Sequence, residues 1–112
     1  MAKTSNVTER SSREAVFPLE GEIDLHVSPS VSASLQEIIA RKPSRLFIDL
    51  SRVTYVDSSA IAVFMQAMQT VEKNGGTFGL VGLQESVKTI FEFAQLNHVF
   101  KIFPDLATAS AA

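Results

Sequence analysis

The chain contains no cysteine, and this absence excludes several kinds of chemistry at once. Disulfide bonds, thiolate metal sites and cysteine nucleophiles all require that side chain, and a chain without it is compatible with the reducing cytoplasm. Histidine is nearly absent as well: His26 and His98 stand alone, with no His-x-x-x-His or glutamate-rich spacing around them. The sequence therefore predicts no metal site.

An excess of charge of one sign is also missing. The chain has 10 basic and 12 acidic residues, a formal net charge of −2, and no basic cluster. Nucleic acids and anionic membranes attract proteins through such clusters, so neither is an expected partner. Long apolar runs are lacking too: residues 1–14 contain no signal core, and no run approaches the length that spans a bilayer. We expect a cytoplasmic protein with no membrane insertion.

What the chain does contain is enough apolar material for one core. Its 112 residues are 46% hydrophobic, which fits one compact domain and hardly two. No internal repeat or linker interrupts it. We therefore expect a single domain over residues 1–112, with residues 1–4 and 107–112 as flexible ends.

Short apolar runs alternate with amphipathic segments along the chain. The runs predict strands, and apolar spacings of three and four predict helices. Gly21 interrupts the second strand pattern, Ser28 is a capping hydroxyl before Pro29, and Asn74 ends the central helix. The expected strands are 5–10, 14–20, 46–50, 77–81 and 99–103, and the expected helices are 29–41, 58–74, 84–95 and a short one from 105 onward. We expect an α/β fold: a mixed, mostly parallel sheet of four to five strands, opened by an antiparallel hairpin and covered by about four helices.

The junction between the strand at 46–50 and the helix at 58–74 is the expected working site. It carries Asp57-Ser58-Ser59, small polar side chains where a helix begins. A helix start has backbone N–H groups without intrahelical partners and the positive end of the helix dipole, so it favours an anion such as a phosphate. A serine in that position could act as a switch.

Each polar residue near the junction has two readings. Ser58 is either a phosphate acceptor or a plain helix cap, and Ser59 is a cap or a packing neighbour. Asp57 either caps the helix or positions Ser58. Asp24, in the loop after Gly21, either contacts a partner or only shapes that loop.

Six apolar residues follow the junction without a polar interruption, at positions 60–65. They cover more than one helical turn and leave the helix start without a polar face. This end of the helix is therefore either wholly buried or partly an interface, and periodicity alone does not distinguish the two. An apolar patch beside a serine would suit protein docking.

The sequence argues against an enzyme. A serine hydrolase would need Ser58 together with a histidine and an acid, but the pattern Gly-x-Ser-x-Gly is absent. Asp57, directly beside Ser58, is poorly placed to orient a histidine. We therefore expect no catalytic residue.

Three stretches together resemble the signature of a known family. They are residues 21–24 (GEID), 46–51 (LFIDLS) and 56–62 (VDSSAIA), and they resemble the STAS domain as found in bacterial anti-sigma-factor antagonists. The resemblance extends across nearly the whole chain. Later residues that are similar to the family's last helix and strand are Gly75, Gly76, Val87, Ile90, Phe91, Leu96, Phe100, Lys101 and Ile102.

The resemblance implies a regulatory protein that acts by binding. In the family, an anti-sigma factor that is also a serine kinase phosphorylates the serine directly after the aspartate, which corresponds to Ser58 here. The unphosphorylated protein binds the kinase and releases the sigma factor; phosphorylation abolishes that binding, and a metal-dependent serine phosphatase restores it. ATP and metal belong to those partners, so this chain is expected to need no cofactor. The residues expected to contact the kinase are Asp24, Asp57, Ser58, Ser59, Ala60, Ile61 and Ala62.

The chain departs from the family pattern at two positions, where Ala60 and Ala62 stand in place of a common glycine. Glycine lets a partner's backbone approach closely, whereas alanine raises helix propensity, so the two methyl groups act either on docking or on stability. The alternative to a switch is a STAS module that does not switch and serves as a scaffold or accessory subunit of a signalling or transporter complex. The sequence leaves the partner kinase, the sigma factor, the pathway and the oligomeric state open.

Overall fold

A computed structural model of the chain describes residues 8–9 and 13–112. In this part of the chain, five strands form one sheet in the order β1-β2-β3-β4-β5. β1 pairs antiparallel with β2, and every other neighbouring pair is parallel. The predicted α/β fold with an opening hairpin and a mostly parallel sheet is therefore confirmed. The strands are β1 (Thr8–Glu9), β2 (Glu14–Ile23), β3 (Arg45–Val56), β4 (Thr77–Val81) and β5 (Ile102–Phe103).

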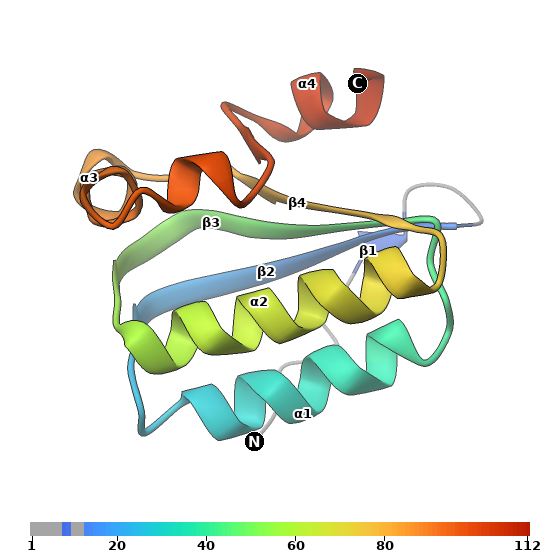
Figure 1. Cartoon of the computed structure of the whole chain (residues 1–112), viewed down its shortest axis with the longest axis horizontal. Coiled ribbons are helices and arrows are strands. Elements are labelled where there is room, and N and C mark those ends of the chain that lie inside the picture. The colour runs from blue at the N-terminus through green and yellow to red at the C-terminus, as the bar shows by residue number, and fades with distance from the viewer. Residues whose placement is uncertain (1–7, 10–12) are drawn as a thin grey trace.

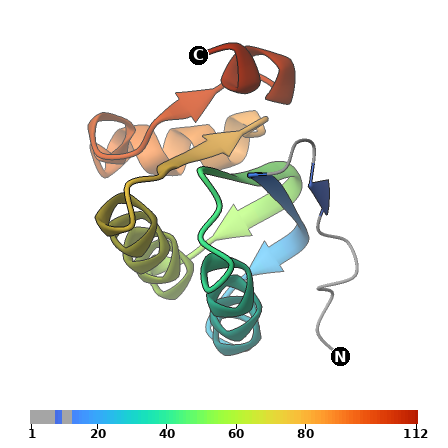
Figure 2. The same ribbon diagram turned by 90° about the vertical axis from the view of Figure 1, so that its right-hand side faces the viewer.

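The helices lie on both sides of this sheet. α1 and α2 run side by side along one face, and α4 lies on the opposite face (Figures 1 and 2). The described helices are α1 (Ser28–Ile39), α2 (Ser58–Lys73), α3 (Glu85–Phe93) and α4 (Leu106–Ala111), with a 3₁₀ turn, η2, at Leu96–His98. None of them combines the length and the apolar composition that a membrane-spanning helix requires.

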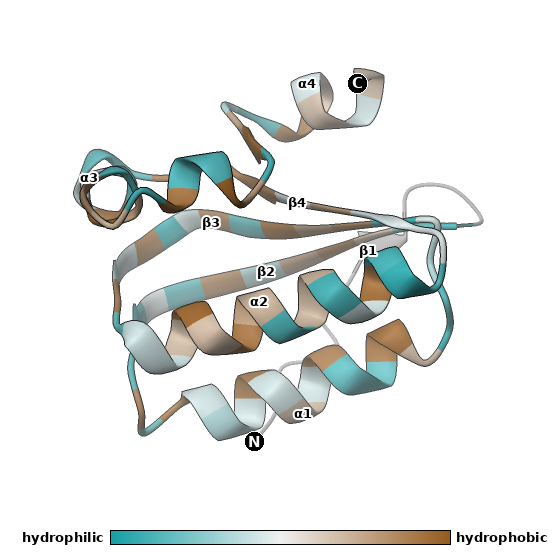
Figure 3. Ribbon diagram, in the orientation of Figure 1, coloured by the Kyte–Doolittle hydropathy of each residue, from teal (hydrophilic) through white to brown (hydrophobic). Residues whose placement is uncertain are grey.

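Two apolar clusters hold the layers together. Hydrophobic residues run along β2, β3 and β4 and alternate with hydrophilic ones along α1 and α2, as Figure 3 shows. The main cluster joins the sheet to α1, α2 and α3, and within it the rings of Phe91 and Phe100 lie 5.7 Å apart in an edge-to-face arrangement. A smaller cluster of Phe47, Val81 and Ala109 lies under α4. Residues 107–112, expected as a flexible end, thus belong mostly to a helix with a buried contact, while residues 1–4 lie outside the described part.

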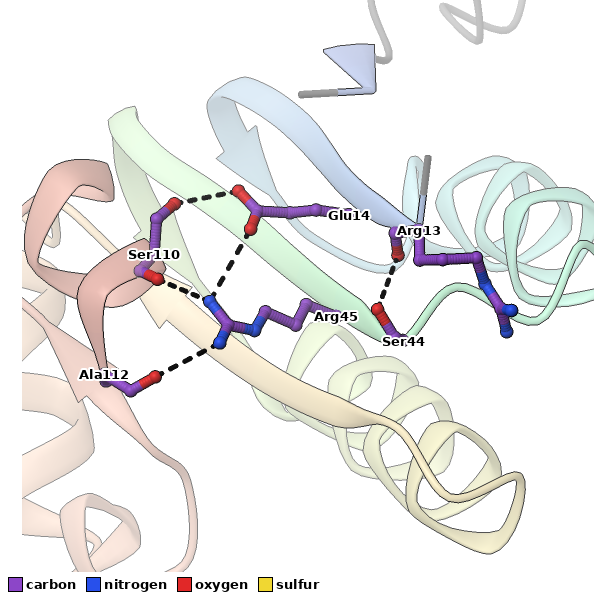
Figure 4. Close-up of polar contacts among 6 residues, drawn as sticks. All are labelled: Arg13, Glu14, Ser44, Arg45, Ser110 and Ala112. Atoms are coloured by element: carbon purple, nitrogen blue, oxygen red, sulfur yellow. Dashed lines mark hydrogen bonds and ion pairs between the residues drawn. The ribbon is translucent and has the colours of Figure 1, made fainter. Parts of the chain in front are cut away.

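α4 is also fixed by a polar cluster at the opposite end of the sheet from the α1 and α2 starts (Figure 4). Arg45, the first residue of β3, donates hydrogen bonds to the backbone oxygens of Ser110 at 2.5 Å and Ala112 at 3.3 Å, and lies 3.7 Å from the Glu14 carboxylate. The Ser110 hydroxyl donates to the same carboxylate at 2.8 Å. Carbonyls at a helix end have no intrahelical partner and carry partial negative charge, so a guanidinium stabilises them.

β2 and β3 are longer than the sequence predicts. The strand expected at 46–50 extends to Val56, and β2 continues past Gly21 to Ile23. The two strands pair with each other along this extension, with register shifts between Pro18 and Glu20 and between Gly21 and Glu22. Gly21 has a φ of +80°, which glycine adopts without strain, so the irregularity bends the strand without ending it. Because of this extension, β2 and β3 end together at the edge of the sheet where the Asp57-Ser58-Ser59 junction lies.

The bounds of three other elements also differ from the expected ones or can be compared only in part. β5 covers only residues 102–103 of the expected 99–103, because η2 turns the chain beforehand and Phe100 is buried in the main core. α3 begins one residue later and ends two residues earlier than expected. Of the first expected strand, 5–10, only Thr8–Glu9 can be compared, and it is a strand; the rest lies outside the described residues.

The predicted cap of α1 is wrong in detail. Ser28 was expected to cap the helix before Pro29, but α1 begins at Ser28 itself, Val27 is the N-cap residue, and no side chain caps this end. Pro29 lies in the first turn, where its missing N–H costs nothing. The Ser28 side chain is 3% exposed and bonds elsewhere, toward the start of α2.

Candidate functional site

The start of α2 lies at the carboxyl end of β3, beside the loop that joins β2 to α1. In Figure 1 both helix starts are at the same end of the molecule. The Asp57 N–H donates to the Ile23 carbonyl at 3.2 Å, and the Leu25 N–H donates to Asp57 Oδ2 at 3.1 Å, so loop and junction are bonded directly. In open α/β sheets, ligand sites form at this carboxyl edge of the strands.

Asp57 is the N-cap residue of α2. Its Oδ1 accepts from the Ser59 N–H at 2.9 Å, the Ala60 N–H at 3.2 Å and the Ser59 hydroxyl at 2.5 Å. The Ser59 hydroxyl bond, helped by the N–H groups of Ala60, Ser59 and Leu25 and opposed by desolvation, holds the pKa of Asp57 below its ordinary value. The capping reading of Asp57 is thus confirmed. The carboxylate of Asp57 thus occupies part of the anion position expected at this helix start, and the N–H of Ser58 is not bonded to it.

Ser58 is the first residue of α2 and is exposed. Within the described residues, its hydroxyl has no hydrogen-bond partner. The reading of Ser58 as a plain helix cap is wrong, because Asp57 fills that role. What remains is a primary hydroxyl that points into solvent at a fixed backbone position.

Ser59 is held in a different way from its neighbour. It is half-buried, its hydroxyl donates to Asp57, and its oxygen lies 2.7 Å from the hydroxyl oxygen of Ser28 in α1. The Ser28 hydroxyl in turn donates to the Asp24 carbonyl at 2.8 Å. Sequence reasoning missed Ser28, since a serine before a proline is read first as a cap of its own helix.

Asp24 shapes the loop between β2 and α1. Its Oδ1 accepts from the His26 N–H at 2.9 Å, and its carbonyl accepts from the N–H groups of Val27 at 3.1 Å and Ser28 at 2.9 Å. The resulting turn leaves Leu25 68% exposed and Val27 37% exposed. The sequence signal for this exposed surface is Leu25, an apolar residue between Asp24 and His26. An argument from apolar periodicity does not detect a single apolar residue in a loop.

The apolar run 60–65 is both core and surface. Ala60 and Phe64 are 0% exposed, Ile61, Val63 and Met65 are half-buried, and Ala62 is exposed. Ala60 was expected to contact a partner, but its methyl group faces the core, so that expectation is corrected. Ala62 lies one turn after Ser58 and therefore on the same face of α2. We define the docking face as Leu25, Val27, Ser58 and Ala62.

The charges near the docking face are negative. Asp24 and Asp57 lie in or beside the loop, and neither takes part in the ion pairs formed among the described residues, which join Arg45 to Glu14 and Arg52 to Glu20. Within the same part of the chain, no His, Asp or Glu side chains gather in the number a metal ion needs. An anion added at Ser58 would thus lie near two carboxylates that are not neutralised by an ion pair with a described residue.

The protein is a mixed α/β domain in which a helix that begins with serines starts at the carboxyl edge of the sheet. This arrangement is typical of one known family of regulatory domains. The STAS domain model matches residues 5–109, so the chain belongs to the STAS domain family. This finding confirms the resemblance carried by residues 21–24, 46–51 and 56–62.

Two of the relatives are named anti-sigma-B factor antagonists. The chain is 28% identical over 96 residues to the anti-sigma-B factor antagonist of Listeria monocytogenes, covering 86% of this chain and 84% of that protein. It is 31% identical over 84 residues to the anti-sigma-B factor antagonist of Bacillus subtilis, covering 75% of this chain and 76% of that protein.

Solved structures share the fold. An anti-sigma factor antagonist from Mycobacterium paratuberculosis superimposes with a TM-score of 0.82 at 24% identity, covering 99% of this chain and 97% of that one. The anti-sigma factor antagonist SpoIIAA in its unphosphorylated form gives a TM-score of 0.79 at 20% identity, with 93% and 90% covered. The phosphorylated form of SpoIIAA from Bacillus gives a TM-score of 0.72 at 19% identity, with 95% and 96% covered.

Proposed function

We propose that this protein is an anti-sigma-factor antagonist that binds an anti-sigma factor with serine kinase activity and is switched off by phosphorylation of Ser58. A serine phosphatase would return it to the binding form. The observation that carries the proposal is the exposed Ser58 hydroxyl, which has no hydrogen-bond partner within the described residues and lies on the docking face. The named relatives from Listeria monocytogenes and Bacillus subtilis support the same function.

The docking face has the composition of a protein interface. Leu25 and Val27 are apolar and exposed, Leu25 lies in the loop that is bonded to Asp57, and Ala62 lies one turn after Ser58. Burial of a leucine or valine side chain against a partner stabilises a complex by roughly 1.5–3 kcal/mol. The loop that carries Leu25 is held by the bond to Asp57, so little ordering entropy is lost on binding. A partner would therefore bury apolar side chains around a neutral serine.

Phosphorylation would oppose that contact through charge and hydration. A phosphate adds a charge of about −1.5 to −2. Two of the backbone donors at the helix start, the N–H groups of Ser59 and Ala60, are bonded to Asp57, so of the first three N–H groups of α2 only that of Ser58 itself is left to hold it. Two unit charges about 4 Å apart repel by roughly 4 kcal/mol at an effective dielectric of 20, and every 1.4 kcal/mol is tenfold in affinity. Loss of affinity by several hundredfold is expected.

The test replaces Ser58 by residues of matched size. Ser58→Asp carries the charge and Ser58→Asn is its neutral counterpart, and both are titrated calorimetrically against the cognate anti-sigma factor. We expect Ser58→Asn to bind within a few-fold of wild type and Ser58→Asp to lose at least a hundredfold. Incubation of wild type with the same kinase and MgATP, followed by mass spectrometry, should place phosphate on Ser58.

Two results would contradict the proposal. Ser58→Asp that binds as tightly as wild type would remove the switch and leave a STAS module that acts as a scaffold or accessory subunit. Phosphate on a residue other than Ser58 would move the switch elsewhere on the domain.

A further inference from the structure

A buried serine connects the starts of α1 and α2. Ser28 is 3% exposed, and its hydroxyl oxygen lies 2.7 Å from that of Ser59 and 2.8 Å from the Asp24 carbonyl oxygen. Buried hydroxyls are retained in proteins when they are hydrogen-bonded.

Ser28 and Ser59 together have two hydroxyl protons for three hydrogen-bond contacts. Ser59 has one hydroxyl proton, which goes to the Asp57 carboxylate at 2.5 Å because an ionised acceptor makes the stronger bond. Ser28 also has one proton and two acceptors in reach. The Asp24 carbonyl already accepts the N–H groups of Val27 and Ser28, whereas the Ser59 oxygen has no other donor among the described residues. Ser59 therefore donates to Asp57, and its oxygen accepts a share of the Ser28 proton, which Ser28 also donates to the Asp24 carbonyl.

We infer that Ser28 is a positioning residue that directs phosphorylation to Ser58 by holding the neighbouring Ser59 hydroxyl in this hydrogen-bonded chain. The inference rests on the proposed function. In the transfer, a serine oxygen forms the new bond to the γ-phosphorus of ATP, the bond to ADP breaks, and the hydroxyl proton passes to a base of the kinase. Ser59 must leave two hydrogen bonds before its oxygen can attack, whereas Ser58 leaves none.

The first experiment measures how fast Ser59 is phosphorylated when Ser58 is removed. In the Ser58→Ala background, the cognate kinase and MgATP should phosphorylate Ser59 slowly. Adding Ser28→Ala removes the donor to Ser59 and should raise that rate about threefold to tenfold, the factor of one hydrogen bond. The matched control is Ser30→Ala in the same background, because the Ser30 hydroxyl is exposed on the same helix and donates to the Val27 carbonyl at 3.1 Å. If Ser28 did not restrain the Ser59 hydroxyl, the Ser59 rate would stay the same in both variants.

The second experiment needs no kinase. Ser28→Ala, Ser59→Ala and the double variant are unfolded in urea, and the two single effects should add to more than the effect of the double variant, because the shared bond is lost only once. Zero coupling would overturn the hydrogen-bonded pair. Coupling with wild-type phosphorylation on Ser58, but an unchanged Ser59 rate in Ser28→Ala, would overturn the positioning role alone. Coupling without any phosphorylation of wild type would overturn the proposed function, and the positioning role with it.

Discussion

Replacing Ala60 and Ala62 by glycine, one at a time, separates stability from docking at the start of α2. Glycine in a helix interior costs about 0.8–1 kcal/mol relative to alanine, and both variants carry that cost. Ala60 is 0% exposed, so its replacement also removes a buried methyl group, whereas Ala62 is exposed. A buried methylene-sized group contributes about 0.8 kcal/mol. We therefore expect losses of roughly 1.5–2 kcal/mol for Ala60→Gly and about 1 kcal/mol for Ala62→Gly.

Urea unfolding followed by circular dichroism measures the difference. With a denaturant slope of about 2 kcal/mol/M, the gap of about 0.8 kcal/mol appears as a difference of roughly 0.4 M between the two unfolding midpoints. The slopes should stay equal, since neither change alters the surface exposed on unfolding. Equal midpoints would show that the Ala60 methyl group is not packed as described, and a lower midpoint for Ala62→Gly would reverse the assignment of core and surface.

Binding gives the same pair a second, independent readout. Ala62 lies on the docking face, and without its methyl group a partner's backbone can approach more closely. Ala62→Gly should bind the cognate anti-sigma factor more tightly than wild type, and Ala60→Gly should bind with wild-type affinity under conditions where it is fully folded. A change of affinity confined to Ala60→Gly would refute the reasoning that only the exposed alanine meets the partner.

Two further predictions concern charge. Because the folded pKa of Asp57 is lowered, its contribution to the free energy of unfolding is present above the ordinary value of 3.8 and is lost as the pH falls through the folded pKa. Asp57→Asn keeps a capping side chain without the titration, so urea midpoints from about pH 5 to about pH 2 should fall less steeply than in wild type; an identical slope would contradict this cause. At the other end of the sheet, Arg45→Met removes the bonds to the α4 carbonyls and should cost about 1–2 kcal/mol and speed hydrogen exchange in α4. The control Arg52→Met breaks an ion pair whose side chains are 79% and 77% exposed and should cost less than about 0.5 kcal/mol, so equal effects would contradict a specific role of Arg45.

The sequence predicts this fold well where local pattern and tertiary packing agree. β4 has the predicted bounds, and α2 ends at Lys73 with Asn74 as its C-cap, because apolar runs and turn residues mark both elements. β3 is longer than predicted because its second half exposes residues such as Arg52 and Thr54 and is a strand only through its pairing with β2. That pairing is a tertiary contact, and no local pattern reports it.

Some features of the candidate site can likewise be predicted from the sequence, and others depend on tertiary packing. Asp57 as cap and the exposed Ser58 follow from their positions at a helix start, which sequence alone defines. The bond between Ser28 and Ser59 joins residues 31 positions apart, and its existence depends on how α1 packs against α2. Likewise, only the packed helix distinguishes the buried Ala60 from the exposed Ala62, since six apolar residues in a row show no periodicity.

The capping role of Asp57 also decides where the charge of a phosphate would act. If the N–H groups of Ser59 and Ala60 were open, a phosphate on Ser58 would fold back onto them and change the helix start. Because Asp57 holds both donors and leaves only the N–H of Ser58 itself, we expect the phosphate to remain exposed to solvent. There the helix dipole would attract it and the carboxylate of Asp57 would repel it. Ser58→Asp should therefore shift the free energy of unfolding by no more than about 0.5 kcal/mol, as other exposed substitutions do. Under the proposed function, phosphorylation would then change the docking face without changing the fold, and a Ser58→Asp variant that lost binding only because it unfolded would refute that view.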